Sequence, residues 1–316
     1  MPIEPPFTQL PDGSLKPSGT FNTLGEIPNP SYFTEISDSA LALKAMYYES
    51  GVRLPDCDLA VYLEDAISLP APPWPRATFH MENGAGVIKV PFNLLRGVRS
   101  LTIAKACACL NGFPKRAEYL YRLTDGPLGG ISPKNSVAKN TYWELELCTA
   151  LRLSGIVAVL QDSPDIVATV DGQRIGIECK KIYSEKHIRN VISKAARQMD
   201  GSFDHGVIAM NIDELWPNEV FANAPRAQLI EQVRQMTHQF VYRHSKAFED
   251  FLHNGRLMGA IIGNGGLVVV DGLVHPVRHL HFWEPGGLAP EKRRLMQLMR
   301  ASIQGAAMPP PEGPAS

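Results

Sequence analysis

The chain has 316 residues, of which 44% are hydrophobic and 20% are charged, and its formal net charge is -1. This composition is typical of a globular protein and excludes the disordered and fibrous classes. A nearly neutral chain has no general attraction to nucleic acid or anionic membranes, so nucleic-acid binding would need a local basic surface. No apolar run reaches the roughly 18 residues that span a bilayer, so we expect no membrane partner.

The N-terminal sequence and the cysteines predict a cytoplasmic protein. The first residues contain no basic segment followed by an apolar core, so they do not resemble a secretory signal. The five cysteines include no Cys-x-x-Cys pair, and Cys148 and Cys179 lie in apolar patterns where a thiol acts as a small hydrophobe. We therefore expect a reducing compartment, no disulfide and no zinc site.

The first part of the chain is predicted to be an arm followed by a mainly helical region. Residues 1–35 are rich in Pro, Gly, Ser and Asn and show little periodicity, so we expect an extended arm. Helical patterns follow at 37–51, 56–69 and 114–126. Residues 77–92 are typical of two strands around an Asn-Gly turn. The loop at 126–135 is the best candidate for a domain boundary.

The rest of the chain alternates between helical and strand patterns. Helices are predicted at 140–155, 187–199, 224–253 and 289–304. Strands are predicted at 156–161, 206–213, 257–263, 266–271 and 277–283, with a hairpin at 165–182. This order predicts an α/β fold, a mixed β-sheet flanked by helices, with an additional mostly helical N-terminal region. The expected parts are the arm (1–35), a helical or mixed region (36–130), the α/β domain (131–305) and a disordered tail (306–316).

The register of the predicted hairpin follows from its turn. With Asp171 and Gly172 as a two-residue turn, the isoleucines of the two strands share one face, which suits the core. The same register places Asp165 opposite Glu178 on the other face, with Lys180 about 7 Å further along that face. The hairpin therefore gathers two carboxylates and an ammonium group.

Two carboxylates opposite each other on a sheet are destabilising unless something neutralises them. A divalent cation does so, and Mg²⁺ is commonly bound by one or two carboxylates with waters and a substrate phosphate. A neighbouring lysine supplies positive charge for a phosphate or for a transition state. Asp165, Glu178 and Lys180 therefore have the chemistry that phosphodiester hydrolysis requires.

A helix with an early Glu, then Pro164-Asp165, a hairpin, and then Glu178-Cys179-Lys180 resembles the PD-(D/E)XK nuclease superfamily. The resemblance covers about residues 140–213 and implies the restriction-endonuclease-like fold. It also implies that Asp165 and Glu178 bind Mg²⁺ or Mn²⁺, and that Lys180 orients water or stabilises charge.

The same resemblance assigns roles to two flanking helices. Glu144 would assist the metal site or the water, and its distance from the end of its helix fits that role better than Glu146 does. Gln198, near the end of the following helix, would be a supporting residue. Both assignments depend on the resemblance and not on the spacing alone.

A DNA substrate needs a local basic surface, and the predicted helix at 187–199 supplies one. Arg189, Lys194 and Arg197 on this helix are the expected phosphate contacts, and the alternative is that they form only a solvated helix face. We therefore expect a metal-dependent endonuclease acting on DNA, and a homodimer if both strands are cut. The habits of the superfamily suggest a role in bacterial restriction or phage defence.

Other interpretations remain open for these residues. Charged residues on a strand often do no more than protect a sheet edge from aggregation, although this leaves Asp165 opposite Glu178 unexplained. The protein could also be a nucleic-acid-binding or interaction module without hydrolysis, or an α/β scaffold whose charged strand is coincidental. Lys181, on the opposite alternation, has no assigned role and is expected to be replaceable. His279 and His281 share one side of a strand, but no third metal ligand stands at a telling spacing.

Overall fold

The computed structural model describes most of the chain, in segments separated by short gaps. The described residues are 7–9, 15–17, 30–70, 75–82, 85–128, 135–199, 203, 205–215, 220–221, 226–252, 257–270 and 272–306. The predicted tail at 306–316 lies outside them apart from Ala306, and so does most of the loop predicted as a domain boundary.

The N-terminal part is mainly helical, as predicted. Its helices are α1 (Pro30–Glu49), α2 (Asp58–Ser68), α3 (Phe92–Ala106), the 3-10 helix η1 (Cys107–Leu110) and α4 (Arg116–Arg122). Two antiparallel strand pairs accompany them, β1 (Phe7–Gln9) with β2 (Leu15–Pro17) and β3 (Thr78–Glu82) with β4 (Ala85–Lys89). The two strands predicted at 77–92 are therefore confirmed, and the Asn-Gly turn predicted between them lies outside the described residues.

The remaining elements form an α/β layer structure. In chain order they are α5 (Val137–Leu153), β5 (Val157–Leu160), β6 (Ile166–Val170), β7 (Gln173–Lys181), η2 (Glu185–His187), α6 (Ile188–Gln198), β8 (His205–Asn211), η3 (Asp213–Leu215), β9 (Val220–Phe221), α7 (Arg226–Leu252), β10 (Leu257–Val270), β11 (Leu273–Trp283) and α8 (Pro290–Ala306). Every helix predicted in this half is present within a few residues of its expected bounds.

The central sheet is mixed, which confirms the predicted class. Its strand order is β11-β10-β8-β7-β6-β5, and β9 pairs with β10 in addition. Strands β5, β6 and β7 are antiparallel neighbours, whereas β8 is parallel to both β7 and β10. The parallel step from β7 to β8 requires a crossover, and α6 provides it.

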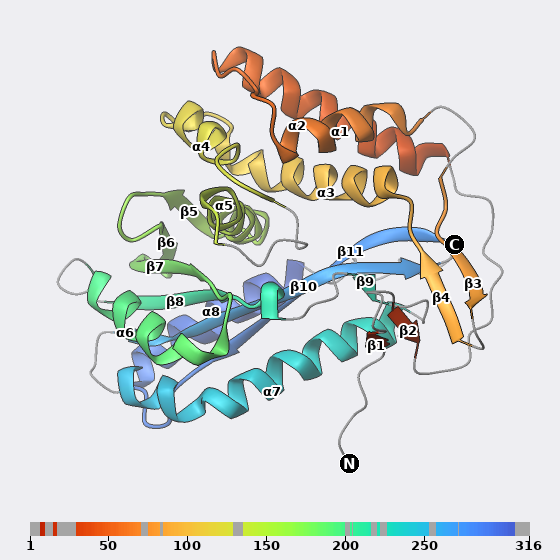
Figure 1. Cartoon of the computed structure of the whole chain (residues 1–316). Coiled ribbons are helices and arrows are strands. Elements are labelled where there is room, and N and C mark those ends of the chain that lie inside the picture. The colour runs from red at the N-terminus through yellow and green to blue at the C-terminus, as the bar shows by residue number, and fades with distance from the viewer. Residues whose placement is uncertain are drawn as a thin grey trace, which may run out of the picture.

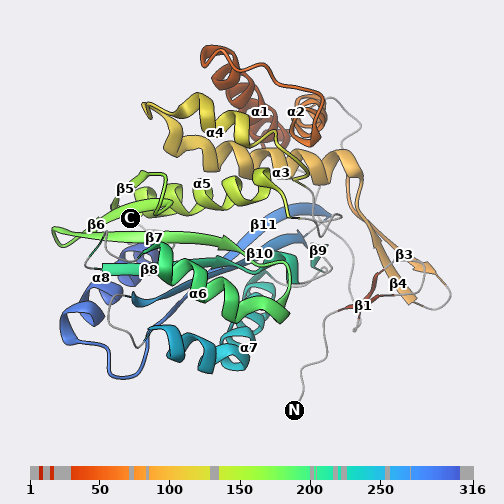
Figure 2. The same ribbon diagram turned by 60° about the vertical axis from the view of Figure 1, so that its left-hand side comes forward.

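Helices cover both faces of the sheet. In Figure 1, α5 and then α1 to α4 lie above the sheet, whereas α6 and α7 lie below it. Figure 2 shows the same layers from a second direction. The buried side chains divide in the same way, into a large cluster that includes α1, α3, α5 and α8 and a smaller one under α6 and α7. The large cluster contains residues from both sides of the predicted domain boundary, for example Leu43, Leu101 and Leu145.

Two stretches differ from the prediction at the N-terminal end. Helix α1 begins at Pro30, inside the predicted arm, because proline with its fixed φ is favourable in the first helical turn. Helix α3 is not predicted by the sequence, because Gly97 interrupts its pattern. A Cβ on Gly97 would lie 2.4 Å from Cδ1 of Leu69, so glycine allows α2 and α3 to approach closely.

The strands predicted at 257–263 and 266–271 are one continuous strand, β10. Glycine usually weakens a strand, so the cluster of glycines from Gly263 to Gly266 predicts a break that does not occur. These glycines serve close packing instead. A Cβ on Gly263 would lie 2.4 Å from the ring of Trp143, and one on Gly265 would lie 2.5 Å from the carbonyl oxygen of Val277.

Among the helices that the structure describes, none combines the length and apolarity needed to cross a membrane.

We predict that Gly263→Ala lowers the free energy of unfolding by about 1–3 kcal/mol, because the added methyl overpacks the Trp143 ring inside a tightly packed core. Urea unfolding followed by tryptophan fluorescence measures the change. Gly286→Ala is the matched control, since a Cβ there meets nothing within 4 Å. Equal stability of the two variants would show that the sheet and α5 do not pack as described.

Candidate active site

The hairpin β6–β7 has the register that its turn predicts. Ile166 pairs with Ile177, and the pairing continues to the turn. Asp171 and Gly172 have φ angles of 51° and 75°, the left-handed values that a type I′ turn needs at both central positions. The predicted register is therefore confirmed from Ile166–Ile177 to the turn, whereas the predicted pair Asp165–Glu178 lies beyond the end of this ladder. The charged end of β7 lies beside the start of β6.

The two strands separate at this end, which we call the fork. Pairing of β6 with β7 stops at Ile166, whereas β7 continues to Lys181 against β8. Asp165, the residue just before β6, turns its carboxylate to the freed backbone of β7. Its Oδ2 accepts a hydrogen bond of 2.7 Å from the Cys179 N–H. Asp165 is thus fixed beside Glu178 by a backbone contact.

Glu178 and Lys180 project from β7 toward the face covered by α6 and α7. Their partners on β8 are Ile208 and Met210, which belong to the buried cluster on that face. Glu178 is only 1% exposed. Lys180 Nζ donates a hydrogen bond to Glu178 Oε1, whereas Glu178 Oε2 is buried without a hydrogen-bond partner among the described residues.

Helix α5 brings a third carboxylate to the site. Glu144 is buried, and both of its oxygens accept hydrogen bonds from Arg122 of α4, at 3.0 and 3.1 Å. Its charge interacts with Asp165 and Lys180. Arg122 is a site residue that the sequence does not reveal, because it lies on another helix with no motif around it. It neutralises part of the negative charge at the fork.

Burial raises the pKa of all three carboxyl groups. For Glu144, burial and then the charge of Asp165 raise the pKa to about 8, although Arg122 opposes the change. Burial also raises the pKa of Asp165, and burial followed by the Asp165 charge raises that of Glu178. Three acids with Arg122 and Lys180 leave an excess of negative charge when all are ionised, and a bound cation would relieve it.

The residues at the fork fit a small divalent cation. Glu178 Oε2 is a buried carboxylate oxygen that lacks a partner, which is costly unless a cation or donor binds it. The three carboxylates are not gathered as a complete cage, because in the described part of the chain only a histidine cluster brings three such ligand atoms within 4.8 Å. A site for Mg²⁺ or Mn²⁺ would therefore use Asp165 and Glu178, with waters and a phosphate as the other ligands.

The remaining predicted residues lie on α6. Gln198 ends this helix, and its Oε1 is buried without a partner among the residues that the structure covers. Arg189, Lys194 and Arg197 are exposed on the same helix. Arg189 forms an ion pair of 2.8 Å with Asp250 of α7. The structure thus brings Glu144, Asp165, Glu178 and Lys180 together, and it leaves the basic residues on the outer surface.

Lys181, which the sequence predicts to be replaceable, is buried and has charged partners in the structure. Its side chain is only 5% exposed, and Nζ donates a hydrogen bond of 2.8 Å to Asn211 Oδ1. It belongs to a buried ion cluster of three cations and three anions. The members of this cluster are Lys139, Glu146, Lys181, Asp213, Glu214 and Arg278. Because the charges balance, loss of one member leaves the cluster with a net charge.

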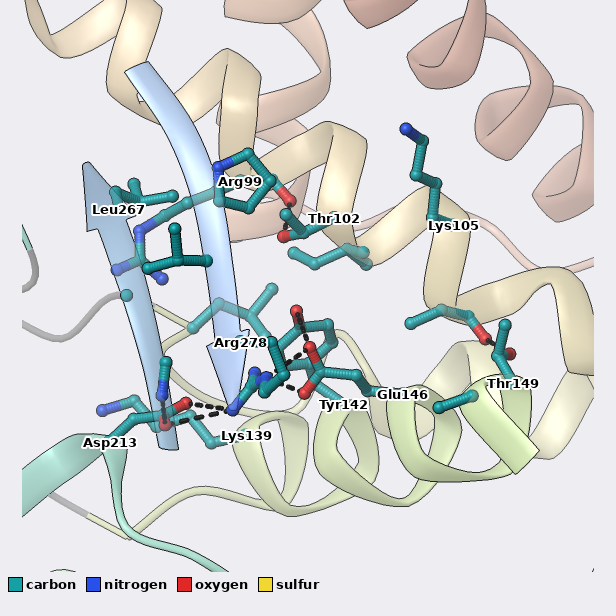
Figure 3. Close-up of a pocket in the computed structure, with 18 of the residues that line it drawn as sticks. Arg99, Thr102, Lys105, Lys139, Tyr142, Glu146, Thr149, Asp213, Leu267 and Arg278 are labelled. Carbon is teal, nitrogen blue, oxygen red and sulfur yellow. Dashed lines mark hydrogen bonds and ion pairs between the residues drawn. The ribbon is translucent and has the colours of Figure 1, made fainter. Parts of the chain in front are cut away.

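The ion cluster lines a cavity of about 370 Å³ between α3, α5 and β10–β11. Figure 3 shows Arg278 at its centre, bound to Asp213 on one side and to Glu146 on the other. Burial alone would raise the pKa of Asp213, but Arg278 and Lys181 lower it below its usual value. The three cations of the ion cluster all have anionic partners within it. The cluster therefore joins α5, β7 and β11 at this cavity.

This cavity is not the predicted site. Glu146 faces the cavity, whereas Glu144 faces Arg122 and the fork. Two positions on a helix differ by about 200° in direction, so the two acids of α5 serve opposite sides. The sequence favours Glu144 over Glu146 as the site residue. In the structure, Glu144 is the acid of α5 that lies near Asp165.

Comparison of the chain with protein-family models, with curated proteins and with solved structures found no match. The resemblance to the nuclease superfamily thus stays a prediction from the sequence. The candidate site is defined by its own geometry, in which one hairpin and one helix bring the charged groups together.

The raised pKa of Glu144 makes a prediction about pH. Because the folded protein holds this proton up to about pH 8 and the unfolded chain releases it near 4.5, stability without divalent cations falls as the pH rises between these values. Each unit of pKa difference corresponds to about 1.4 kcal/mol. Glu144→Gln removes the titrating group, so urea unfolding over this pH range should give a flatter profile. The same slope in both proteins would contradict the assignment.

The ion cluster predicts a stability effect at Lys181. We expect Lys181→Met to lower the free energy of unfolding by about 1–3 kcal/mol, because the cluster is left with a net negative charge and Asn211 Oδ1 loses a donor. Lys186→Met, at an exposed position of η2, is the control and should unfold at the same urea concentration as the unaltered protein. If the two variants were equally stable, Lys181 would have no structural role.

Proposed function

We propose that this protein is a divalent-metal-dependent nuclease that hydrolyses phosphodiester bonds of DNA at the fork. The observation that carries the proposal is the convergence of Asp165, Glu178 and Lys180 from one hairpin, with a buried oxygen of Glu178 left without a partner. Neighbouring buried carboxylates lower the stability of a fold, so their presence argues for a functional role.

The order and pairing of the elements support a restriction-endonuclease-like core. Helix α5, the antiparallel strands β5, β6 and β7, the helix α6 and the parallel strand β8 follow one another as the motif from Glu144 to Gln198 requires. The acidic helix residue, the aspartate before the hairpin and the Glu-x-Lys strand then occupy neighbouring positions in space. A coincidental charged strand would not need this combination.

The residues of the fork have separate roles in the proposed reaction. The Cys179 N–H holds the Asp165 carboxylate in one orientation, so that it faces the same space as Glu178. Lys180 keeps Glu178 in place through Oε1 and leaves Oε2 free to bind. The ammonium of Lys180 can also stabilise the negative charge that develops on a phosphate during hydrolysis. Arg122 donates hydrogen bonds to both oxygens of Glu144 and thereby fixes its carboxyl group near Lys180.

Asp165 and Glu178 would hold the metal, and Glu144 stands next to them. A bound Mg²⁺ or Mn²⁺ supplies charge neutralisation and makes a water molecule acidic enough to attack phosphate at neutral pH. Without metal, burial and the Asp165 charge raise the pKa of Glu144 to about 8, so this group is mostly protonated at neutral pH. A cation bound nearby would lower this pKa, and the ionised Glu144 could then assist the water. The chain thus offers metal ligands, a cation and a third carboxyl group at one place.

The exposed residues Arg189, Lys194 and Arg197 of α6 are the proposed contacts to the DNA backbone. They lie on the helix that follows β7 and covers the same sheet face as Glu178.

Cleavage of both DNA strands would require two active sites, so we propose a homodimer. A role in bacterial restriction or phage defence is proposed on the sequence resemblance alone. The second candidate function, DNA binding without hydrolysis, would use α6 but not the fork.

The proposal predicts metal-dependent cleavage that depends on the fork. Purified protein is incubated with supercoiled plasmid, linear duplex, single-stranded DNA and RNA, with Mg²⁺, Mn²⁺ or EDTA. We expect cleavage of DNA with metal only. Asp165→Asn, Glu178→Gln and Lys180→Met should each lower the rate by about 100-fold or more.

Glu249→Gln, which alters an exposed carboxylate of α7, is the matched control and should keep full activity. Circular dichroism of each variant checks that the fold is intact. Cleavage that survives in both Asp165→Asn and Lys180→Met would place the activity elsewhere. Retention of DNA on a gel without cleavage in any metal would favour the binding module.

A further inference from the structure

Three histidines far from the fork meet between α7 and β11. His279 and His281 are two residues apart on β11, so they share one face of the strand, and His238 on α7 lies against them. One ring nitrogen from each histidine lies within 4.8 Å of the other two. The sequence shows the His-x-His pair but gives no sign of His238, which is 41 positions earlier on another element.

The geometry of the three rings is compatible with a shared metal ion. The ring centroid of His238 lies 4.7 Å from that of His281 and 6.3 Å from that of His279. Zinc binds imidazole nitrogen at 2.0–2.1 Å, and in a tetrahedral site two such nitrogens stand about 3.4 Å apart. Small rotations of the side chains bring the nitrogens from within 4.8 Å to this separation. His238 is exposed, so its ring has room to turn.

Two buried polar atoms beside these rings lack partners in the described part of the chain. They are Nε2 of His279 and Oδ1 of Asn264. Asn264 is the β10 residue that pairs directly with His279, so both atoms lie on the face toward α7. A metal ion accepts the lone pair of an imidazole nitrogen, and a water bound to the metal can donate to an amide oxygen. One bound ion would therefore satisfy both atoms.

Packing of aromatic rings is the simpler explanation for the cluster, but it does not account for the buried nitrogen. The rings of His238 and His281 meet edge to face at 67°, which is a favourable ring geometry. Such packing leaves Nε2 of His279 without a hydrogen bond at a cost in stability. The neighbouring acid, Glu231, accepts hydrogen bonds of 2.6 and 3.0 Å from Arg234 and Gln235, and it is not a partner of Nε2 of His279.

We propose that His238, His279 and His281 form a zinc site that ties α7 to the edge strand β11. Three imidazoles suit Zn²⁺ rather than Mg²⁺, which prefers oxygen ligands. His238 also lines a surface hollow together with Gln239, Tyr242 and Arg243, through which solvent reaches this histidine. The site shares no residue with the fork, so it goes beyond the proposed nuclease function and stands independently of it.

The test is Zn²⁺ binding to the full-length protein, measured by competition with a chromophoric chelator and by thermal unfolding with and without Zn²⁺. We expect one tightly bound Zn²⁺ per chain and a rise in melting temperature. His238→Ala should weaken binding at least tenfold and remove the melting shift. His238 is exposed on a helix, so this variant is expected to fold, and His281→Ala provides a second test from the strand side.

Two controls separate this site from others. His187→Ala alters an exposed histidine of η2 outside the cluster and should leave Zn²⁺ binding unchanged. Glu178→Gln disables the fork and should also leave it unchanged. The proposal is overturned if His238→Ala and the unaltered protein bind Zn²⁺ equally, or if Glu178→Gln loses the bound ion.

Discussion

The register of the β6–β7 hairpin is the constraint on which the proposed site depends. A shift by one residue would move Glu178 and Lys180 to the opposite face of the sheet and bring Cys179 into their place. Two independent features fix this register. The backbone conformation of the Asp171-Gly172 turn sets the pairing at one end, and burial of the isoleucines of both strands sets which face lies in the core. Because β6 then ends while β7 continues, a backbone N–H becomes free at Cys179, and Asp165 occupies it. The fork is thus a consequence of strand lengths as much as of charge.

Two groups of charged residues lie on opposite sides of α5. On one side, the ion cluster around Arg278 is balanced in charge, and its members bind one another. On the other side, Glu144, Asp165 and Glu178 exceed Arg122 and Lys180 in number, and one buried oxygen has no partner among the described residues. Charged groups are partly or fully buried on both sides, and the two groups differ in how completely their charges are compensated. We infer that the balanced cluster stabilises the fold, and we propose that the unbalanced group binds a cation.

Local patterns in the sequence predict the parts of the structure that local physics determines. The hairpin register and the helices of the α/β half follow from turn chemistry and alternation, whereas the position of Glu144 near Asp165 is expected only from the resemblance. The missed features come from contacts between distant segments. Gly97 and Gly263 look like interruptions in a helix and a strand, yet Leu69 and Trp143 pack where their side chains would be. Arg122, the partners of Lys181 and the position of His238 depend on how helices dock, and one sequence carries no local sign of that.

The central claim is that Asp165 and Glu178 together hold a divalent metal ion at the fork. The most direct test is anomalous diffraction from crystals of the full-length protein soaked in Mn²⁺. The account predicts a manganese peak between the Asp165 and Glu178 carboxylates, bound to Oε2 of Glu178, and its loss in crystals of Glu178→Gln. A fork without manganese under conditions that support DNA cleavage, or a peak that persists in the variant, would contradict it.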